Sequence, residues 1–225
     1  SKDVHPVKTN TAVRLSLHLK QAYEEVYVLL FCIALQVLGL NSRIVSSICL
    51  AGGNSAKGKS NSPTKRIHPS WWAEVFSPID HIWTPIDPIN GISKCNAGFK
   101  VDTMTRDHIF VVAWEPSGFA VDVTRRYSKK YNSVVWKCRR PFEDLFVTSL
   151  RTFNHGLEGS CFYDEESELV GFSDKEPFPN SSAELACNRK YILESSLRKY
   201  EVFFPENKIV GQFKGENIHL RESIR

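Results

Sequence analysis

Hydrolysis of an amide by a cysteine requires three side chains in a fixed arrangement. A thiolate attacks, an imidazole within hydrogen-bond reach activates it, and a carboxylate orients the imidazole. The thiol belongs on the first turn of a helix, because the helix N-terminus lowers the pKa of a thiol placed there. The chain holds six cysteines and seven histidines. The question is whether any of them occupies such a position.

The cysteines do not favour nucleophilic or metal chemistry. Cys32 lies within the apolar run Val26–Leu35, where a buried and neutral thiol is expected. The six residues are widely spaced, and no two of them form a C-x-x-C motif: Cys32, Cys49, Cys95, Cys138, Cys161 and Cys187. We therefore predict reduced, structural thiols, no bound metal and no cofactor.

A hairpin is predicted over Trp71–Pro88, W-W-A-E-V-F-S-P-I-D-H-I-W-T-P-I-D-P, because two apolar runs flank the turn Ser77–Asp80. It resembles the hairpin that carries a catalytic His and then a catalytic Asp in transglutaminase-like hydrolases. Asp87 fits the position of the Asp, but Ser70 stands where the His is expected.

The position of the nucleophile is also lost. In transglutaminase-like domains it lies about fifteen residues before the glycine that ends the central helix. Counting back from Gly39 reaches Glu24, which cannot act as a thiol. Glu24, Ser70 and Asp87 thus mark a degenerate triad, and we predict that Asp87 makes hydrogen bonds in the turn at Pro88 instead of orienting a histidine.

The elements that would position these residues form an α+β fold. A helix is predicted over residues 12–38. Within it only Gln36 is polar from Val26 to Leu38, which predicts a central helix that is covered all round and ends at Gly39. Strands are predicted at Arg43–Leu50, Ile109–Trp114 and Phe119–Val123. Together with the hairpin they make an antiparallel sheet that packs on the helix.

The chain is long enough for one sizeable domain and a small module. We predict a first domain over residues 1–155 with a flexible insertion at 51–67, an acidic connector at 156–181 and a small α/β module at 182–225. Further helices are predicted at Arg139–Arg151 and at residues 182–199, followed by short strands and turns in the tail.

The charge distribution permits a polyanionic partner. The net charge is +4 and the sequence pI about 8.7, values that many domains without such a partner share. Basic residues interleave with Tyr127, Tyr131 and Trp136, a pattern that suits phosphate contacts but also a surface of stacked Arg and Tyr. The candidate DNA-binding residues are Arg125, Arg126, Lys137, Arg139, Arg140, Arg198, Lys199, Lys208, Lys214 and Arg221.

Several stretches are similar to the XPC family, the DNA-damage sensors of nucleotide excision repair. The similarity is strongest at F-A-V-D-V-T-R-R-Y, Phe119–Tyr127. It also covers the central helix from Glu24, the hairpin, Y-I-L-E-S-S-L-R-K-Y-E-V-F-F-P at Tyr191–Pro205, and G-Q-F-K-G-E at Gly211–Glu216. The last stretch resembles the first β-hairpin domain of that family.

The resemblance implies a transglutaminase-like core without catalytic activity, followed by a DNA-binding hairpin domain. It implies double-stranded and damaged DNA and a ubiquitin-like adaptor as partners, with a nuclear location. Contacts with centrin and the TFIIH complex would run through regions outside this chain. In the family, two later hairpin domains open the helix and capture the flipped nucleotides of the undamaged strand, and we expect them to be absent from these 225 residues. Asn188-Arg189-Lys190-Tyr191 also departs from the family's usual Asn-His-Pro-Tyr.

Three hypotheses remain from the sequence. The first is a duplex-DNA-binding module without enzymatic activity. The second is a scaffold for the adaptor, on which the basic face is incidental. The third is a residual peptide hydrolase or glycanase. We also expect no membrane segment, since the longest apolar run, Val26–Leu35, is far too short to span a bilayer.

Overall fold

The structure is a computed structural model. It describes residues 14, 23–49, 71–89, 108–128, 130–159, 165–203 and 209–224. The predictions for the insertion at 51–67, for Ser70 and for Lys208 lie outside these ranges. No helix in the described ranges is long and apolar enough to cross a bilayer.

The first unit is built on an antiparallel sheet of five strands. Its strands are β1 (Ser42–Cys49), β2 (Trp71–Ser77), β3 (Ile82–Ile86), β4 (His108–Trp114) and β5 (Ala120–Asp122). They are arranged in the order β3-β2-β1-β4-β5. The hairpin of β2 and β3 therefore adds two strands to one side of β1, and its predicted turn is held by a 2.9 Å hydrogen bond from the Ser77 hydroxyl to Asp80.

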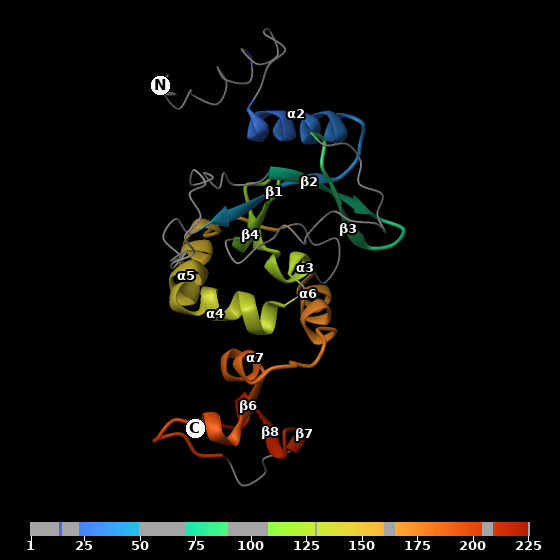
Figure 1. Ribbon diagram of the computed structural model, residues 1–225. Coiled ribbons are helices and arrows are strands. Elements are labelled where there is room, and N and C mark those ends of the chain that lie inside the picture. Colours follow the sequence, from blue (N-terminus) through green and yellow to red (C-terminus); the bar gives the residue numbers. More distant parts are fainter. Residues whose placement is uncertain are drawn as a thin grey trace, which may run out of the picture.

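Helices cover both faces of this sheet. On one face α2 (Glu24–Val37) packs Val28 and Cys32 against Ala73 of β2. On the other face α3 (Thr124–Tyr127) and α6 (Glu165–Asp174) bury Tyr127 and Leu169. Successive residues of a strand point to opposite faces, so each strand serves both cores. The predicted α+β fold is confirmed (Figure 1).

The ending of α2 follows from Gly39. Its backbone has φ +81°, its N–H donates to the Gln36 carbonyl at 2.9 Å, and the N–H of Leu40 donates to the Leu35 carbonyl at 3.0 Å. This pair of bonds is a Schellman motif, which favours glycine because the left-handed conformation is strained for other residues. The predicted end of the helix at Gly39 is confirmed.

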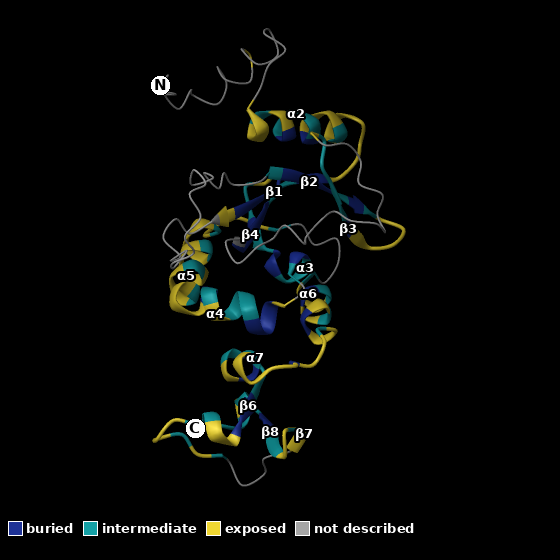
Figure 2. Ribbon diagram, in the orientation of Figure 1, coloured by how far each residue is buried: buried dark blue, intermediate teal, exposed yellow. Residues whose placement is uncertain are grey.

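The prediction that α2 is covered on all sides is wrong for the described residues. Its apolar outer side is exposed, with Val37 at 82% and Leu38 at 75%. Figure 2 shows the alternation of buried and exposed residues along this helix. The sheet covers one face of the helix, and no other described element packs on the opposite side.

The helical segment after β5 is longer than predicted. It comprises a π-helical turn at Tyr131–Val135, α4 (Trp136–Arg139), a 3₁₀ turn at Arg140–Phe142 and α5 (Glu143–Phe153). The predicted helix at residues 139–151 thus corresponds to the end of α4, the 3₁₀ turn and most of α5. Phe146 and Phe153 of α5 pack on Phe110 and Trp114 of β4, which fixes α5 to the sheet.

The prediction of an acidic connector over residues 156–181 is wrong for its central part. Residues 165–174 form α6, and Leu169 of this helix is 1% exposed in the core of the first unit. The acidic residues suggested a solvated segment, but their carboxylates face buried arginines, as described below. This acidic helix is stable because the arginines that pair with its carboxylates lie elsewhere in the chain.

The second unit contains a three-stranded antiparallel sheet and a short helix. Its elements are α7 (Ser182–Cys187), β6 (Tyr191–Leu193), a 3₁₀ turn at Glu194–Ser196, β7 (Ile209–Phe213), β8 (Glu216–Leu220) and a 3₁₀ turn at Arg221–Ser223. The order of strands is β6-β8-β7. Lys214 and Gly215, both with positive φ, form the turn between β7 and β8.

The predicted helix over residues 182–199 is much shorter in the structure. The side-chain oxygen of Asn188 accepts hydrogen bonds from the N–H groups of Lys190 and Tyr191, at 2.8 and 3.0 Å. This Asx-type turn ends α7, and the residues that follow pair with β8. The strand pairing therefore overrides the helical pattern that the sequence suggested.

Hydrogen bonds and ion pairs join the two units. The N–H of Arg189 donates to the Asn132 carbonyl at 2.6 Å, and the Lys130 amine contacts Glu184 at 2.5 Å. The Arg189 guanidinium also lies 4.8 Å from the centre of the Trp136 ring. The second unit is thus attached to the first at the π-helical turn and α4.

Candidate nucleic-acid interface

The degenerate triad positions hold no catalytic arrangement in the described residues. Glu24 is the first residue of α2 and is exposed. Asp87 accepts a hydrogen bond of 2.9 Å from the N–H of Ile89, which confirms the predicted role in the turn at Pro88. His81 lies in the hairpin turn with φ +54°.

Cys32 is a core residue. Its thiol is buried and lies 3.5 Å from the Arg43 carbonyl, to which it donates. Burial raises the pKa of Cys32 to about 12, and the hydrogen bond with Ser42 only partly opposes this. A thiol with that pKa stays protonated at neutral pH and is a poor nucleophile. The prediction of a neutral, structural thiol is confirmed.

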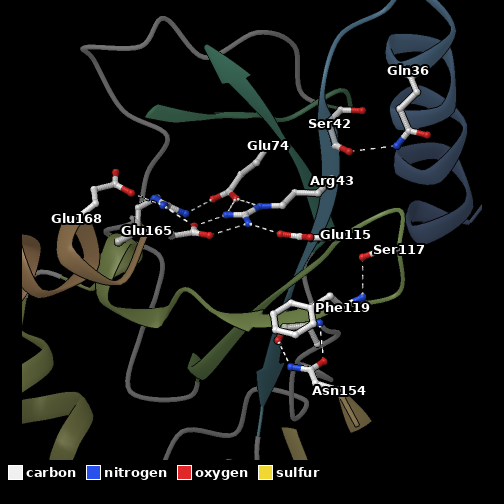
Figure 3. Close-up of polar contacts among 12 residues, drawn as sticks. Gln36, Ser42, Arg43, Glu74, Glu115, Ser117, Phe119, Asn154, Glu165 and Glu168 are labelled. Atoms are coloured by element: carbon white, nitrogen blue, oxygen red, sulfur yellow. Dashed lines mark hydrogen bonds and ion pairs between the residues drawn. The ribbon is translucent and has the colours of Figure 1, made fainter. Parts of the chain in front are cut away.

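A buried network of charges occupies the face of the sheet opposite α2 (Figure 3). Arg43 of β1 donates to Glu74 of β2 at 2.7 Å. It also forms a bidentate ion pair with Glu165 of α6, with distances of 3.0 and 2.5 Å. The side chains of Arg43 and Glu74 are completely buried. Glu115 lies 3.6 Å from the same guanidinium.

Arg126 of α3 is the second arginine of this network. It contacts Glu74 at 3.0 Å, Glu165 at 2.8 Å and Glu168 at 2.5 Å. The Tyr127 hydroxyl donates to Glu74 as well, at 2.5 Å. Since two arginines and several carboxylates from four elements, β1, β2, α3 and α6, are held by hydrogen bonds and ion pairs, the network ties α3 and α6 to the sheet.

The pKa shifts agree with this charge pairing. Burial would raise the pKa of Glu74, but the charges of Arg43 and Arg126 outweigh it and hold the pKa below the ordinary value. Burial would lower the pKa of Arg126, but Glu74 outweighs it and raises the pKa. Arg43, Glu74 and Arg126 therefore stay ionised together.

The structure removes Arg126 and Arg139 from the predicted DNA-binding set. The side chain of Arg126 is 6% exposed, and its guanidinium contacts three carboxylates. Arg139 is 1% exposed and pairs with Asp122 and Glu143. A guanidinium that is buried against carboxylates is not available to a phosphate without breaking those pairs.

Arg125 is also committed to a structural contact. It pairs with Glu166 of α6 at 2.6 Å, and its side chain is 20% exposed. Its guanidinium lies 5.6 Å from the centre of the Tyr131 ring. Tyr127 and Tyr131 are buried, so they cannot stack on bases. For this segment the contacts favour the alternative of stacked Arg and Tyr within the protein, with the tyrosines buried and not at the surface.

The other described cations of the predicted set are exposed, apart from the partly buried Arg221. Lys137 of α4 and Arg140 of the following turn carry no ion pair with any described carboxylate. In the second unit Arg198 and Lys199 are exposed, and Arg198 contacts Glu201 at 3.9 Å. Lys214 is exposed in the β7–β8 turn, beside the Phe213 ring.

Five of these residues form what we call the junction cluster: Lys137, Arg140, Arg198, Lys199 and Arg221. Burial lowers the pKa of Arg221, and the charges of Arg140 and Arg198 lower it further, whereas Glu201 raises it, so both arginines lie close enough to act on Arg221. Arg221 is anchored by a hydrogen bond of 2.9 Å to the Asn188 carbonyl. The cluster thus combines cations from both units.

Lys137 lies at the edge of a cleft of about 280 Å³ between the units, which Cys138 of α4 and Cys187 of α7 also line. In the described residues no group of three or more His, Cys, Asp or Glu side chains could hold a metal ion. What the junction can offer is an array of exposed positive charge, which suits a polyanion such as a phosphate backbone.

Comparison with known families separates the chain into the same two parts. The family model of the Rad4 transglutaminase-like domain matches residues 51–168, and that of Rad4 β-hairpin domain 1 matches residues 175–224. The chain belongs to the Rad4/XPC family. The transglutaminase-like fold and the hairpin domain inferred from the sequence are therefore confirmed for this Rad4/XPC chain.

The relatives of this Rad4/XPC chain are DNA repair proteins. The Drosophila melanogaster protein named "DNA repair protein complementing XP-C cells homolog" is 25% identical over 158 residues, covering 68% of this chain and 12% of that protein. The Schizosaccharomyces pombe "DNA repair protein rhp41" is 25% identical over 158 residues, covering 66% of this chain and 25% of that protein. The chain thus spans a quarter or less of the length of these relatives.

Solved structures support the same fold. A structure of Rad4–Rad23 bound to a 6-4 photoproduct UV lesion has a TM-score of 0.76 and 20% identity, covering 100% of this chain and 50% of that chain. A structure of Rad4–Rad23 crosslinked to undamaged DNA has a TM-score of 0.77 and 20% identity, covering 99% and 50%. At this identity the likeness establishes the arrangement of elements.

Sequence reasoning found the cations of the junction cluster but could not sort them from the buried ones. The signal that could have done so is the acidic pattern Glu165-Glu166-Ser167-Glu168, whose spacing places carboxylates on adjacent turns of a helix. Such a helix needs cationic partners if it is to pack. Arg125 and Arg126 are two of them.

Proposed function

We propose that this chain is a duplex-DNA-binding part of a DNA-damage recognition protein of nucleotide excision repair, and that it is not an enzyme. The observation that carries the proposal is the junction cluster, in which exposed cations from both units gather. Family membership supports it, as do the names of the relatives, which are DNA repair proteins. A nuclear location follows from a role in genome repair.

The proposed binding mode is contact with phosphates and little reading of bases. Lys and Arg side chains contact the backbone of any sequence, and each neutralised phosphate releases counterions. Damage recognition itself would then need parts of the longer protein beyond this chain. Within the chain we assign the first domain to residues up to α6 and the DNA-binding hairpin domain to the residues from α7 onwards.

The absence of enzymatic activity is supported by the groups at the degenerate triad. Glu24 replaces a thiol at the start of α2, and Cys32 is buried and protonated. Incubation with a glycopeptide, with and without prior thiol alkylation, tests this. Turnover that alkylation abolishes would contradict the proposal.

The test of DNA binding is fluorescence anisotropy of a labelled, undamaged duplex between 50 and 200 mM salt. Contact with about five phosphates predicts a slope of about −4.5 in log K against log salt, and a loss of affinity on the order of 10²-fold or more across this range. Binding that does not change with salt, or no binding at 50 mM, would contradict the proposal.

A second candidate function is a scaffold for a ubiquitin-like adaptor, with the DNA affinity incidental. The exposed apolar side of α2 favours a protein partner of some kind, since large apolar residues such as Val37 and Leu38 stand in solvent. The solved relative Rad4 is described in complex with Rad23. We propose that this chain contacts a Rad23-like adaptor as well as DNA.

One variant separates the two functions. Replacement of Lys137, Arg140 and Lys199 by glutamine removes three exposed charges without touching the apolar side of α2. We expect this variant to bind the duplex more weakly and to keep the adaptor, as measured by co-purification with a Rad23-like protein. Equal DNA binding by the variant and the parent chain would favour the scaffold.

A further inference from the structure

A tight turn at Arg198–Glu201 projects from the second unit. The N–H of Glu201 donates to the Arg198 carbonyl at 3.0 Å, and the N–H of Arg198 donates back to the Glu201 carboxylate at 2.9 Å. These two bonds close the turn from both sides. Lys199 and Tyr200 are therefore held at its tip by the backbone and do not depend on side-chain packing for their position.

Tyr200 is the most exposed aromatic side chain among the described residues, at 87%. For comparison, Tyr27 on α2 is 49% exposed and Phe153 on α5 is 51% exposed. An aromatic ring carries a large apolar surface together with a polar tip, which is why such residues are enriched at binding interfaces. A ring held in solvent by a closed turn contributes nothing to the core of the second unit.

The turn stands among the cations of the junction cluster. Arg198 is its first residue, with a side chain 69% exposed, and Lys199 precedes the tyrosine. Both Arg198 and Glu201 act electrostatically on Arg221, which places the base of the turn near that residue. Among the charged groups near the turn, the carboxylate of Glu201 is engaged in closing it.

We propose that Tyr200 contacts the DNA itself and packs its ring against the deoxyribose wall of a groove of the duplex. This inference rests on the proposed function, and it adds an apolar contact to the phosphate contacts. Arg198 and Lys199, on the two residues before it, hold the phosphates that border the same groove. The contact is independent of sequence because every nucleotide presents the same sugar.

An apolar contact and a phosphate contact differ in their response to salt. Removing a Lys or Arg that neutralises a phosphate reduces the salt slope by about 0.9, because one counterion fewer is released. Removing an uncharged ring weakens binding at every salt concentration and leaves the slope unchanged. The role of Tyr200 can thus be told apart from that of Arg198.

The experiment compares Tyr200→Ala and Tyr200→Phe with the parent chain, by anisotropy on an undamaged duplex from 50 to 200 mM salt. We expect Tyr200→Ala to bind roughly tenfold more weakly with the parent slope. Tyr200→Phe keeps the ring and should bind like the parent. Tyr27→Ala is the matched control, a half-exposed tyrosine on α2 at the other end of the molecule (Figure 1).

Each outcome of this experiment supports or overturns the role of Tyr200. Parent-like binding by Tyr200→Ala, while the parent shows a steep salt slope, overturns the role of Tyr200 and leaves the proposed function intact. A slope reduced by about one unit assigns the tyrosine to a phosphate and overturns the groove contact. A loss seen only with a labelled single strand of the same sequence, measured in parallel, overturns the assignment to duplex. Failure of the parent to bind DNA overturns the proposed function as well. Equal thermal unfolding midpoints show that the variants are folded.

Discussion

At the scale of residues, the central finding is that arginines next to one another in sequence have different roles. Arg139 is buried against Asp122 and Glu143, whereas Arg140 is exposed without a described carboxylate partner. Two consecutive positions of a helical segment thus hold a structural guanidinium and an exposed one. Composition cannot distinguish the two, because the distinction depends on which face of the segment the sheet covers.

Replacing Arg126 by glutamine should strongly destabilise the protein. The change leaves the buried carboxylate of Glu74, together with Glu165 and Glu168, with one arginine fewer. We expect a loss of about 3–5 kcal/mol in the free energy of unfolding, measured by urea denaturation. Arg140→Gln is the matched control and should change stability by less than about 0.5 kcal/mol. Similar stabilities for the two variants would contradict the buried network.

Stability should decline in acid because of Glu74. Its folded-state pKa lies below the ordinary value of 4.5, so the ionised form is favoured by folding. The resulting stability is fully present above the unfolded pKa and is lost as the pH falls through the folded pKa. Urea denaturation at pH 7, 5, 4 and 3 should show a decrease confined to the acidic end. Stability that stays constant to pH 3 would argue against ion pairing of Glu74.

At the scale of elements, two glycines with different backbone conformations should respond to replacement by alanine with opposite changes in stability. Gly39 ends α2 with φ +81°, whereas Gly171 lies inside α6 with open space where a Cβ would stand. Gly39→Ala should destabilise by about 1–2 kcal/mol through left-handed strain. Gly171→Ala should stabilise by roughly 0.5–1 kcal/mol, because alanine favours a helix interior. Thermal unfolding of the two variants checks the signs, and a stabilising Gly39→Ala would contradict the assigned helix end.

The elements also show which parts of the fold could be predicted from sequence patterns and which could not. The hairpin Trp71–Pro88 and the end of α2 could be predicted because each depends on local turn chemistry. The identity of α6 could not, because its acidic residues are stabilised by arginines far away in the sequence, such as Arg43. The predicted helix after Ser182 failed for a related reason, since strand pairing with β8 decided the outcome.

At the scale of the whole molecule, the junction between the two units determines which cations lie together on the surface. Bonds such as that from Arg189 to the Asn132 carbonyl fix the second unit beside α4. As a result cations from both units, Arg140 and Arg221 among them, gather into one cluster. The transglutaminase-like core thus supplies part of the proposed binding surface, and the positions predicted as a degenerate triad, Glu24 and Asp87 among them, are not members of the cluster.

The most direct test of this account is the salt dependence of duplex binding by the triple variant Lys137→Gln, Arg140→Gln, Lys199→Gln. If each residue neutralises one phosphate, the slope of log K against log salt should become shallower by about 2.7 relative to the parent chain. Arg151→Gln, a change at an exposed arginine on α5, should leave the slope as it is. A triple variant with the parent slope and affinity would contradict the claim that the junction cluster holds DNA.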